Sequence, residues 1–453
     1  MVKTNKAQLL HHLESKVESC SSPEIDLSVY VIDGNAVLQA CVHLPETFED
    51  LALQIFVSLP KSKVIHFVTD SYQQHSIKQF EHDRRGQTAA YCIKGPRTKI
   101  PSDFKAFMLN ASNKTQLIRF LLSQWQSDKY ATRFLGRQIY FVCEEKCVCL
   151  TSLDGVTTST VPTDSLNSNQ EEADTRIVLH CLHVTEPSTS ETVVKVRSPD
   201  TDVLIILLYY AERIKVQLYF DTGVGSKRRM IDIQAIAKVI GSDVCQALPA
   251  FHAFTGCDFN SAFVRRGKLS PYKLLNQHSE FKSLFGRMGN LVHFQESNTA
   301  DMERFVCHMY GRPACSDVNK VRFDLFCSRY DVKSECTSLT VPDGIDLSLL
   351  PPCQSSLLMH ARRANYIAFI WQNAHVQYPN IPGPNGFGWK LHTDGSIAVE
   401  WNDGDIMPQQ LIDILPSSDC DTATNTENFQ GLEVEEDYKI DNILDVVFDE
   451  DED

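Results

Sequence analysis

Long apolar runs are missing from this sequence. No stretch of about 18 apolar residues occurs in it, so a membrane-spanning helix is not expected. The first eight residues are polar and basic rather than apolar, which argues against a secretory signal there. The 15 cysteines are therefore expected to be reduced thiols inside a cell.

A second cysteine pair at zinc-finger spacing is also missing. Cys143, Cys147 and Cys149 form a C-x3-C-x-C cluster, which could hold zinc if a fourth ligand came from elsewhere in the chain. The surrounding letters, QIYFVC and CVCL, are instead typical of strands, and free cysteine is often buried. We therefore favour buried strand residues over a zinc site.

Basic residues are nearly absent from the end of the chain. Residues 401–453 hold 17 acids and one base, a balance of −16 within a total of −15, which leaves +1 for residues 1–400. We expect residues 416–453 to form an acidic disordered tail. Its apolar residues at helical spacing could bind a protein partner, or the tail could serve only solubility. These residues are Ile440, Ile443, Leu444 and Val447.

The near-neutral body of the chain still carries short basic clusters that could meet phosphate groups. They are Lys94, Arg97, Lys99, Lys227, Arg228, Arg229, Arg265, Arg266 and Lys268. Such clusters are also common on ordinary solvated surfaces, so charge alone identifies no partner.

Short β-branched runs alternate with helical patterns through the first 275 residues. The expected strands are 27–32, 64–68, 138–142, 193–196 and 216–220, with helices at 115–125 and 232–240. Near-continuous apolar strands separated by helices predict an α/β domain over residues 27–275, a twisted and mostly parallel sheet with helices on both faces.

Flanking this domain we expect a helical extension at residues 1–26 and a mainly helical region at 276–415. Two alternating runs around Asp394 and Gly395 predict a small hairpin within that region.

Acidic residues follow three of the expected strands. Asp33 follows the first strand and Asp70 the second, while Asp200 and Asp202 follow the strand at 193–196. Because ligands gather outside the carboxyl ends of parallel strands, these four side chains should converge in one crevice.

Three further acids occupy turn or helix-start positions. Glu172 and Asp174 lie where a helix begins, and Asp258 follows Gly256 in FTGCDF. Each acid taken alone is more typical of a helix cap or a loop. Crowded carboxylates are costly to keep ionised without cations, so the whole set predicts two Mg²⁺ or Mn²⁺ ions. Two such ions about 4 Å apart can support displacement at a phosphodiester.

The order of these motifs resembles the flap-endonuclease and XPG-type nuclease family, whose catalytic domain is PIN-like. The matching blocks are VIDGN, VTDSY, EEADT, SPDTD and GCD, within residues 27–275. The resemblance implies that Asp33, Asp70, Glu172 and Asp174 hold one metal ion and that Asp200, Asp202 and Asp258 hold the other.

The same resemblance implies roles for basic residues. Lys78, Arg84 and Arg85 would lie near the scissile phosphate, while Arg265, Arg266 and Lys268 would contact the backbone of duplex nucleic acid. Position 174 departs from the family, which has Glu there, and the usual glycine-rich hairpin is reduced to Arg266-Gly267-Lys268. Beyond residue 275 the chain resembles an uncharacterised animal group, which shares EEADTR, SPDTDVL, FTGCD and a later LPPC...RANY block.

The sequence therefore predicts a divalent-metal-dependent, structure-selective nuclease acting on DNA or RNA phosphodiesters, with branched or flapped DNA as the expected substrate and a nuclear location. The alternative is a catalytically silent PIN-like scaffold that binds nucleic acid or protein. A third reading treats the acids as helix caps in an unrelated α/β enzyme.

Overall fold

The computed structural model describes residues 2–17, 28–73, 76–84, 88–185, 192–290, 296–328 and 346–404. Residues 1–222 and 230–403 group into one compact unit, while 223–229 and the chain from Gly404 form a second unit. The described part of the second unit includes a single 3-10 turn, Gly225–Lys227. The predicted acidic tail lies outside the described residues.

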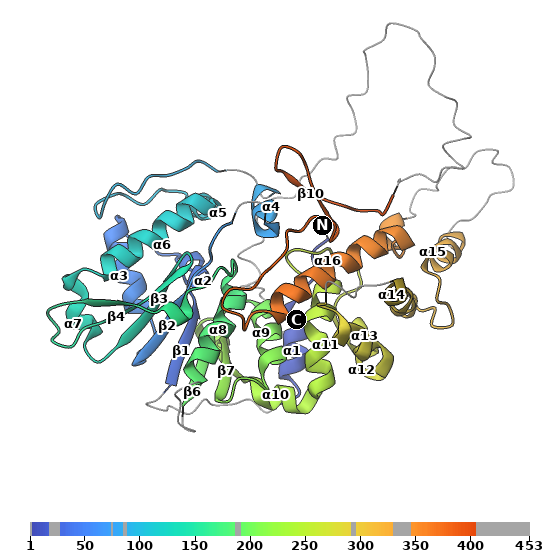
Figure 1. Cartoon of the computed structure of the whole chain (residues 1–453), viewed down its shortest axis with the longest axis horizontal. Helices are drawn as coiled ribbons and strands as arrows, with labels where there is room; N and C mark the ends of the chain where they lie inside the picture. The colour runs from blue at the N-terminus through green and yellow to red at the C-terminus, as the bar shows by residue number, and fades with distance from the viewer. Residues whose placement is uncertain are drawn as a thin grey trace, which may run out of the picture. The chain divides into compact units, whose positions relative to one another are not determined.

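An eight-stranded sheet forms the centre of the larger unit (Figure 1). The strands are β1 (Ser28–Asp33), β2 (Val64–Val68), β3 (Gln138–Cys143), β4 (Lys146–Thr151), β5 (Ser159–Pro162), β6 (Val193–Arg197), β7 (Gln217–Thr222) and β8 (Arg229–Asp232). Their order is β5-β4-β3-β2-β1-β6-β7-β8. The four pairs among β3, β2, β1, β6 and β7 are parallel, and β4 pairs antiparallel with β3 and β5. The expectation of a mostly parallel sheet is confirmed, and each of the five predicted strands is present.

Helices cover both faces of this sheet, which explains its nearly continuous apolar strands. One face is covered by α3 (Phe48–Ser58), α5 (Phe104–Leu109) and α6 (Ala111–Trp125). The other is covered by α8 (Ala173–Thr185), α9 (Thr201–Tyr210) and helices that follow them (Figure 1). Neighbouring residues of β1 divide between the two cores, Val31 facing α8 and α9 and Ile32 facing α3 and α6.

Capping residues set where several helices begin. Asp232 caps α10 (Ile233–Ile240) by accepting a hydrogen bond from Ala235 N–H at 2.8 Å. Helix α6 begins four residues before the predicted start at 115, because the side chain of Asn110 accepts from Asn113 N–H.

The remaining helices are α1 (Ala7–Glu14), α2 (Gly34–Gln39), α4 (Ile77–Arg84), α7 (Ala131–Phe134), α11 (Ser242–Phe254), α12 (Leu269–Gln277), α13 (Ser279–Arg287), α14 (Glu296–Met309), α15 (Val318–Cys327) and α16 (Gln354–Gln372). The region after residue 275 is helical, as predicted, and α16 packs against α11. The predicted hairpin is also present, as β9 (Trp389–Leu391) paired antiparallel with β10 (Ile397–Val399).

A buried arginine ties this hairpin to the helices. The Arg363 guanidinium of α16 donates to Asn260 Oδ1, to Gly388 O at 3.1 Å and to Glu400 O at 2.7 Å. Gly388 has a φ of +90°, and a Cβ there would come within 2.7 Å of Arg363 Cγ. Only glycine therefore fits where the hairpin passes over α16.

The three clustered cysteines lie on strands, as predicted. Cys143 ends β3, and Cys147 and Cys149 lie on β4. Burial raises the pKa of the Cys147 thiol to about 12, so this thiol is protonated at neutral pH. Within the described ranges, no helix is long and apolar enough to cross a membrane.

Truncating the aromatic core should destabilise the sheet. Phe141 is fully buried, and its ring lies 5.2 Å from those of Phe67 and Trp125. Phe141→Ala is expected to lower the free energy of unfolding by ~3–5 kcal/mol, measured by urea denaturation. The control Val57→Ala, at a side chain that is 65% exposed, should change it by less than about 0.5 kcal/mol. Equal effects of the two variants would contradict this description of the core.

Candidate metal centre

Four acids lie at the carboxyl ends of three adjacent strands. Asp33 is the last residue of β1, Asp70 follows β2, and Asp200 and Asp202 follow β6. The chain runs from β1 to β2 and β3 on one side and reaches β6 and β7 on the other, so the strand order reverses beside β1. Such a reversal opens a crevice in α/β sheets, and this is where the acids converge.

The N-termini of three helices point to the same edge. Asp33 caps α2 by accepting from Ala36 N–H at 2.9 Å, and Asp200 caps α9 by accepting from Asp202 N–H at 2.8 Å. Glu172 O accepts the first helical bond of α8, from Arg176 N–H. Capping and clustering are therefore compatible, since the positive ends of the helix dipoles help to hold the carboxylates together.

One half of the cluster is neutralised by a lysine. The Lys78 ammonium on α4 lies 2.9 Å from Asp70 Oδ2 and 3.1 Å from Glu172 Oε1. The contact with Glu172 is an ion pair that lacks hydrogen-bond geometry. Burial opposes ionisation of Asp70, but Lys78, the Ala173 N–H and Lys114 together outweigh it and hold the pKa of Asp70 below its usual value. Burial raises the pKa of Glu172 to about 7, because Lys78 offsets only part of the desolvation.

Other side chains hold this half in place. Asn35 Nδ2 donates to Asp70 Oδ2 at 2.7 Å, and Ala173 N–H donates to Asp70 Oδ1. The Tyr72 ring lies 4.8 Å from the Lys78 ammonium and 5.0 Å from that of Lys114, a residue of α6. Lys78 is thus buried beside the carboxylates, where the sequence predicted a basic residue.

Asp174 lies between the two halves. Burial, then the charges of Asp200 and Glu172, raise the pKa of Asp174 well above its usual value. Burial likewise raises the pKa of Asp33 and of Asp200 to about 7. Among the described residues, Asp174 has no ion pair and accepts no hydrogen bond at its carboxylate.

A second lysine occupies the other half. The Lys6 ammonium lies 2.6 Å from Asp258 Oδ1, 3.0 Å from Asp202 Oδ2 and 3.9 Å from Asp200 Oδ1. No sequence motif indicates a role for Lys6, which lies in a polar segment far from the acidic motifs. All seven predicted acids thus interact at one edge of the sheet, and two lysines share it with them.

A buried histidine orients Asp202. His252 Nε2 of α11 lies 2.8 Å from Asp202 Oδ1, and its side chain is fully buried. Burial lowers the pKa of His252 well below its usual value, so the neutral ring donates its Nε2–H to the carboxylate. A polar residue within the apolar helix α11 was a signal for such a role, because a buried polar group needs a partner.

Lys268 is a correction to the sequence analysis. It was predicted to contact nucleic acid, but it is fully buried and donates to His252 O at 2.8 Å and to Thr255 Oγ1 at 2.9 Å. Burial lowers the pKa of Lys268 to about 7. Its ammonium joins the end of α11 to the start of α12 and does not reach the surface.

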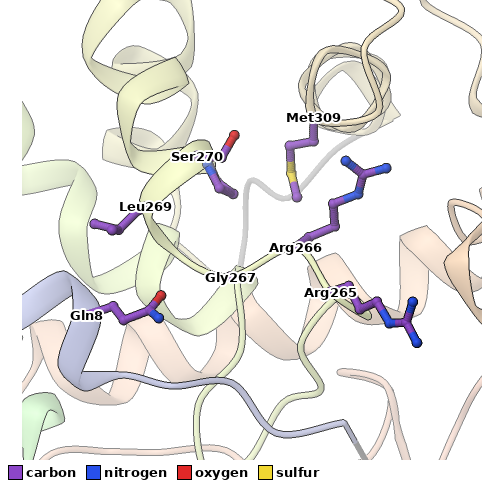
Figure 2. A pocket seen from close by; sticks show the side chains of 8 residues that line it. Gln8, Arg265, Arg266, Gly267, Leu269, Ser270 and Met309 are labelled. Carbon is purple, nitrogen blue, oxygen red and sulfur yellow. The ribbon is translucent and has the colours of Figure 1, made fainter. Parts of the chain in front are cut away.

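The other predicted basic residues lie elsewhere. Arg84 ends α4, although its side chain and the whole of Arg85 lie outside the described residues. Arg265 and Arg266 line a cavity of about 230 Å³ at the start of α12, together with Gln8, Gly267, Leu269, Ser270, Pro271 and Met309. Figure 2 shows both guanidinium groups on one side of the loop and Gln8 on the other. The Arg266 guanidinium also stacks 4.3 Å from the Tyr310 ring.

Comparison with protein-family models and with curated proteins finds no match to this chain. The resemblance of its motifs to the flap-endonuclease family therefore stays a prediction.

The donor set fits a hard divalent cation. One carboxylate oxygen each of Asp174, Asp200 and Asp202 lies within 4.8 Å of the other two. Oxygen ligands suit Mg²⁺ or Mn²⁺, and burial together with the neighbouring carboxylates raises the pKa of Asp174 and of Asp200, so a bound cation would favour their ionised forms.

Removing one of these charges should stabilise the metal-free protein. Asp174→Asn is expected to raise the melting temperature in EDTA at pH 8.5 by about 2 °C, the scale of ~1 kcal/mol in a large domain. The gain should shrink toward pH 6. The pKa of Asp174 is raised above its ordinary value of 3.8 in the folded protein, so the cost of its charge grows as the pH rises from the unfolded pKa to the folded pKa and is smaller at pH 6 than at pH 8.5.

The matched control is Asp243→Asn, which changes an exposed acid in the first turn of α11. It should not raise the melting temperature. With saturating Mn²⁺ the wild type should instead have the higher melting temperature, because only its site binds the ion at full strength and is stabilised by it in full. A destabilised Asp174→Asn protein in EDTA at pH 8.5 would show that the charges do not repel as described.

Proposed function

We propose that this chain is a divalent-metal-dependent, structure-selective nuclease with a PIN-like domain of the flap-endonuclease type at residues 27–275. The observation that carries the proposal is the environment of Asp174, a largely enclosed carboxylate among seven acids. Among the described residues, no cation pairs with Asp174. A protein that used these acids only as helix caps would gain nothing from leaving such a charge uncompensated.

Asp174 and Asp200 would hold an ion, with Asp33, Asp70, Glu172, Asp202 and Asp258 around them. When bound, Mg²⁺ or Mn²⁺ would lower the pKa of water and offset negative charge on a phosphodiester. Hydrolysis joins the oxygen of water to phosphorus and breaks one ester bond, and the released oxygen takes up a proton. His252 would keep Asp202 in one orientation through this reaction, since its Nε2–H fixes Oδ1.

The substrate would be a nucleic acid, and branched or flapped DNA fits the family resemblance. Arg265 and Arg266 beside the N-terminus of α12 offer charge and backbone N–H groups to a phosphate. Among the described residues, we propose these two arginines for contact with the nucleic-acid backbone. Lys268 is excluded because it is fully buried.

The alternative is a silent PIN-like scaffold, and one observation favours it. Lys6 and Lys78 already form ion pairs with five of the seven acids, so the site can persist without a metal ion. A scaffold would need no ion at Asp174, so measured metal binding separates the two functions.

Loss of one ligand should abolish cleavage without unfolding the protein. Asp200→Asn is expected to lower the rate on a 5′-flapped duplex with Mg²⁺ or Mn²⁺ by at least ~100-fold, the scale for loss of an electrostatic contact at a reacting centre. Asparagine caps helices as well as aspartate does, so α9 should keep its cap.

The control is Asp103→Asn, which changes the N-cap of α5 at an exposed position away from the cluster. This variant should cleave like the wild type. Branched, single-stranded and RNA substrates belong in the same assay, and a wild-type protein that cuts none of them with either metal would refute the proposal.

Arg265→Gln should weaken binding of branched DNA in EDTA. One lost phosphate contact is expected to reduce the slope of log affinity against log salt concentration by about 1. The control Arg287→Gln removes an exposed guanidinium on α13 that pairs with Asp301 and should leave the slope unchanged. A slope that stays at the wild-type value for Arg265→Gln would place the contact elsewhere.

A further inference from the structure

The N-terminal segment supplies a cation to the metal centre. Lys6 comes from just before α1, nearly 200 residues from the nearest of its partners in sequence, yet its ammonium touches Asp202 and Asp258 and approaches Asp200. Its side chain is only 19% exposed. These are the three acids to which the sequence resemblance assigned a second metal ion.

The segment is anchored on both sides of Lys6. Before it, Val2 N–H donates to Ser261 Oγ at 2.8 Å, and Val2 O accepts from Ala262 N–H at 2.7 Å. After it, Leu9, Leu10 and Leu13 of α1 are buried against α9 and α12 (Figure 1). Buried leucines resist withdrawal from a core, so Lys6 is held among the acids by the fold itself.

Lys6 also takes up the ligand atoms of this half. Asp202 Oδ1 is bound to His252 and Asp202 Oδ2 to Lys6, while Asp258 Oδ1 is bound to Lys6 as well. A divalent ion among the same oxygens would lie within a few Å of a fixed ammonium, and the two positive charges would repel each other. Asp174, by contrast, forms an ion pair with neither lysine in the described part of the chain.

We propose that Lys6 is the second cation of this centre, so that the protein binds a single divalent ion on the Asp174 and Asp200 side. The inference rests on the proposed function, which supplies the first ion, and it replaces the pair of ions expected from the sequence. Lys6 acts as a positioning residue, because its charge fixes Asp202 and Asp258 without an ion between them.

The test is the number of Mn²⁺ ions bound by the full chain, measured by calorimetry at moderate salt. Asp174→Asn measures background binding, including that of the acidic residues after position 400. Above this background, the wild type is expected to bind one ion. Lys6→Met, which keeps the length of the side chain but removes its charge, is expected to bind two.

Two controls accompany this variant. Lys6→Arg restores the charge and should bind one ion, and Lys3→Met removes an exposed lysine of the same segment and should also bind one. Electron paramagnetic resonance gives a readout independent of activity. The wild type should show isolated Mn²⁺, and Lys6→Met should show a spin-coupled pair.

Two specific ions in the wild-type protein would overturn the inference and leave the proposed function standing, and this result needs no variant to fold. One ion in both the wild type and a folded Lys6→Met would also overturn it, because Lys6 would then not limit the number of bound Mn²⁺ ions. No specific ion in either protein would instead refute the proposed metal centre itself.

Discussion

Repulsion among crowded carboxylates is the constraint on which the site depends. Seven acids share one edge of the sheet, and burial raises the pKa of Asp33, Glu172 and Asp200 to about 7. Such crowding persists only where opposite charge is near. The fold brings that charge from two distant places, Lys78 on α4 and Lys6 before α1, and leaves the middle of the cluster to be balanced by something else.

The topology explains why the acids meet. Parallel strands place their carboxyl ends at one edge, and the reversal of order beside β1 spreads α2 and α9 apart there. A helix N-terminus stabilises the same acidic side chains that would bind a cation. Asp33 and Asp200 therefore serve both as helix caps and as members of the cluster. Structural and functional roles do not compete at these positions, which is why single residues were poor evidence of function.

The sequence predicted the strands well because β-branched runs such as 64–68 carry a local signal, and it predicted the convergence of the acids because strand ends have a fixed geometry. It failed where a contact depends on tertiary packing alone. Nothing near Lys6 indicates that α1 folds back onto α9 and α12, and the burial of Lys268 depends on a carbonyl at the end of α11. Basic residues are the hardest to assign, because a solvated lysine and an enclosed one have the same local sequence.

The N-terminal segment has a geometric consequence for the whole surface. Lys6 lies in the carboxylate cluster and Gln8 lines the arginine cavity, although only one residue separates them. Two residues of chain span at most about 7 Å, so this stretch of backbone fixes the spacing between the acidic and the basic regions. Any ligand that reached both regions would therefore meet them at a separation set by the backbone of residues 6–8.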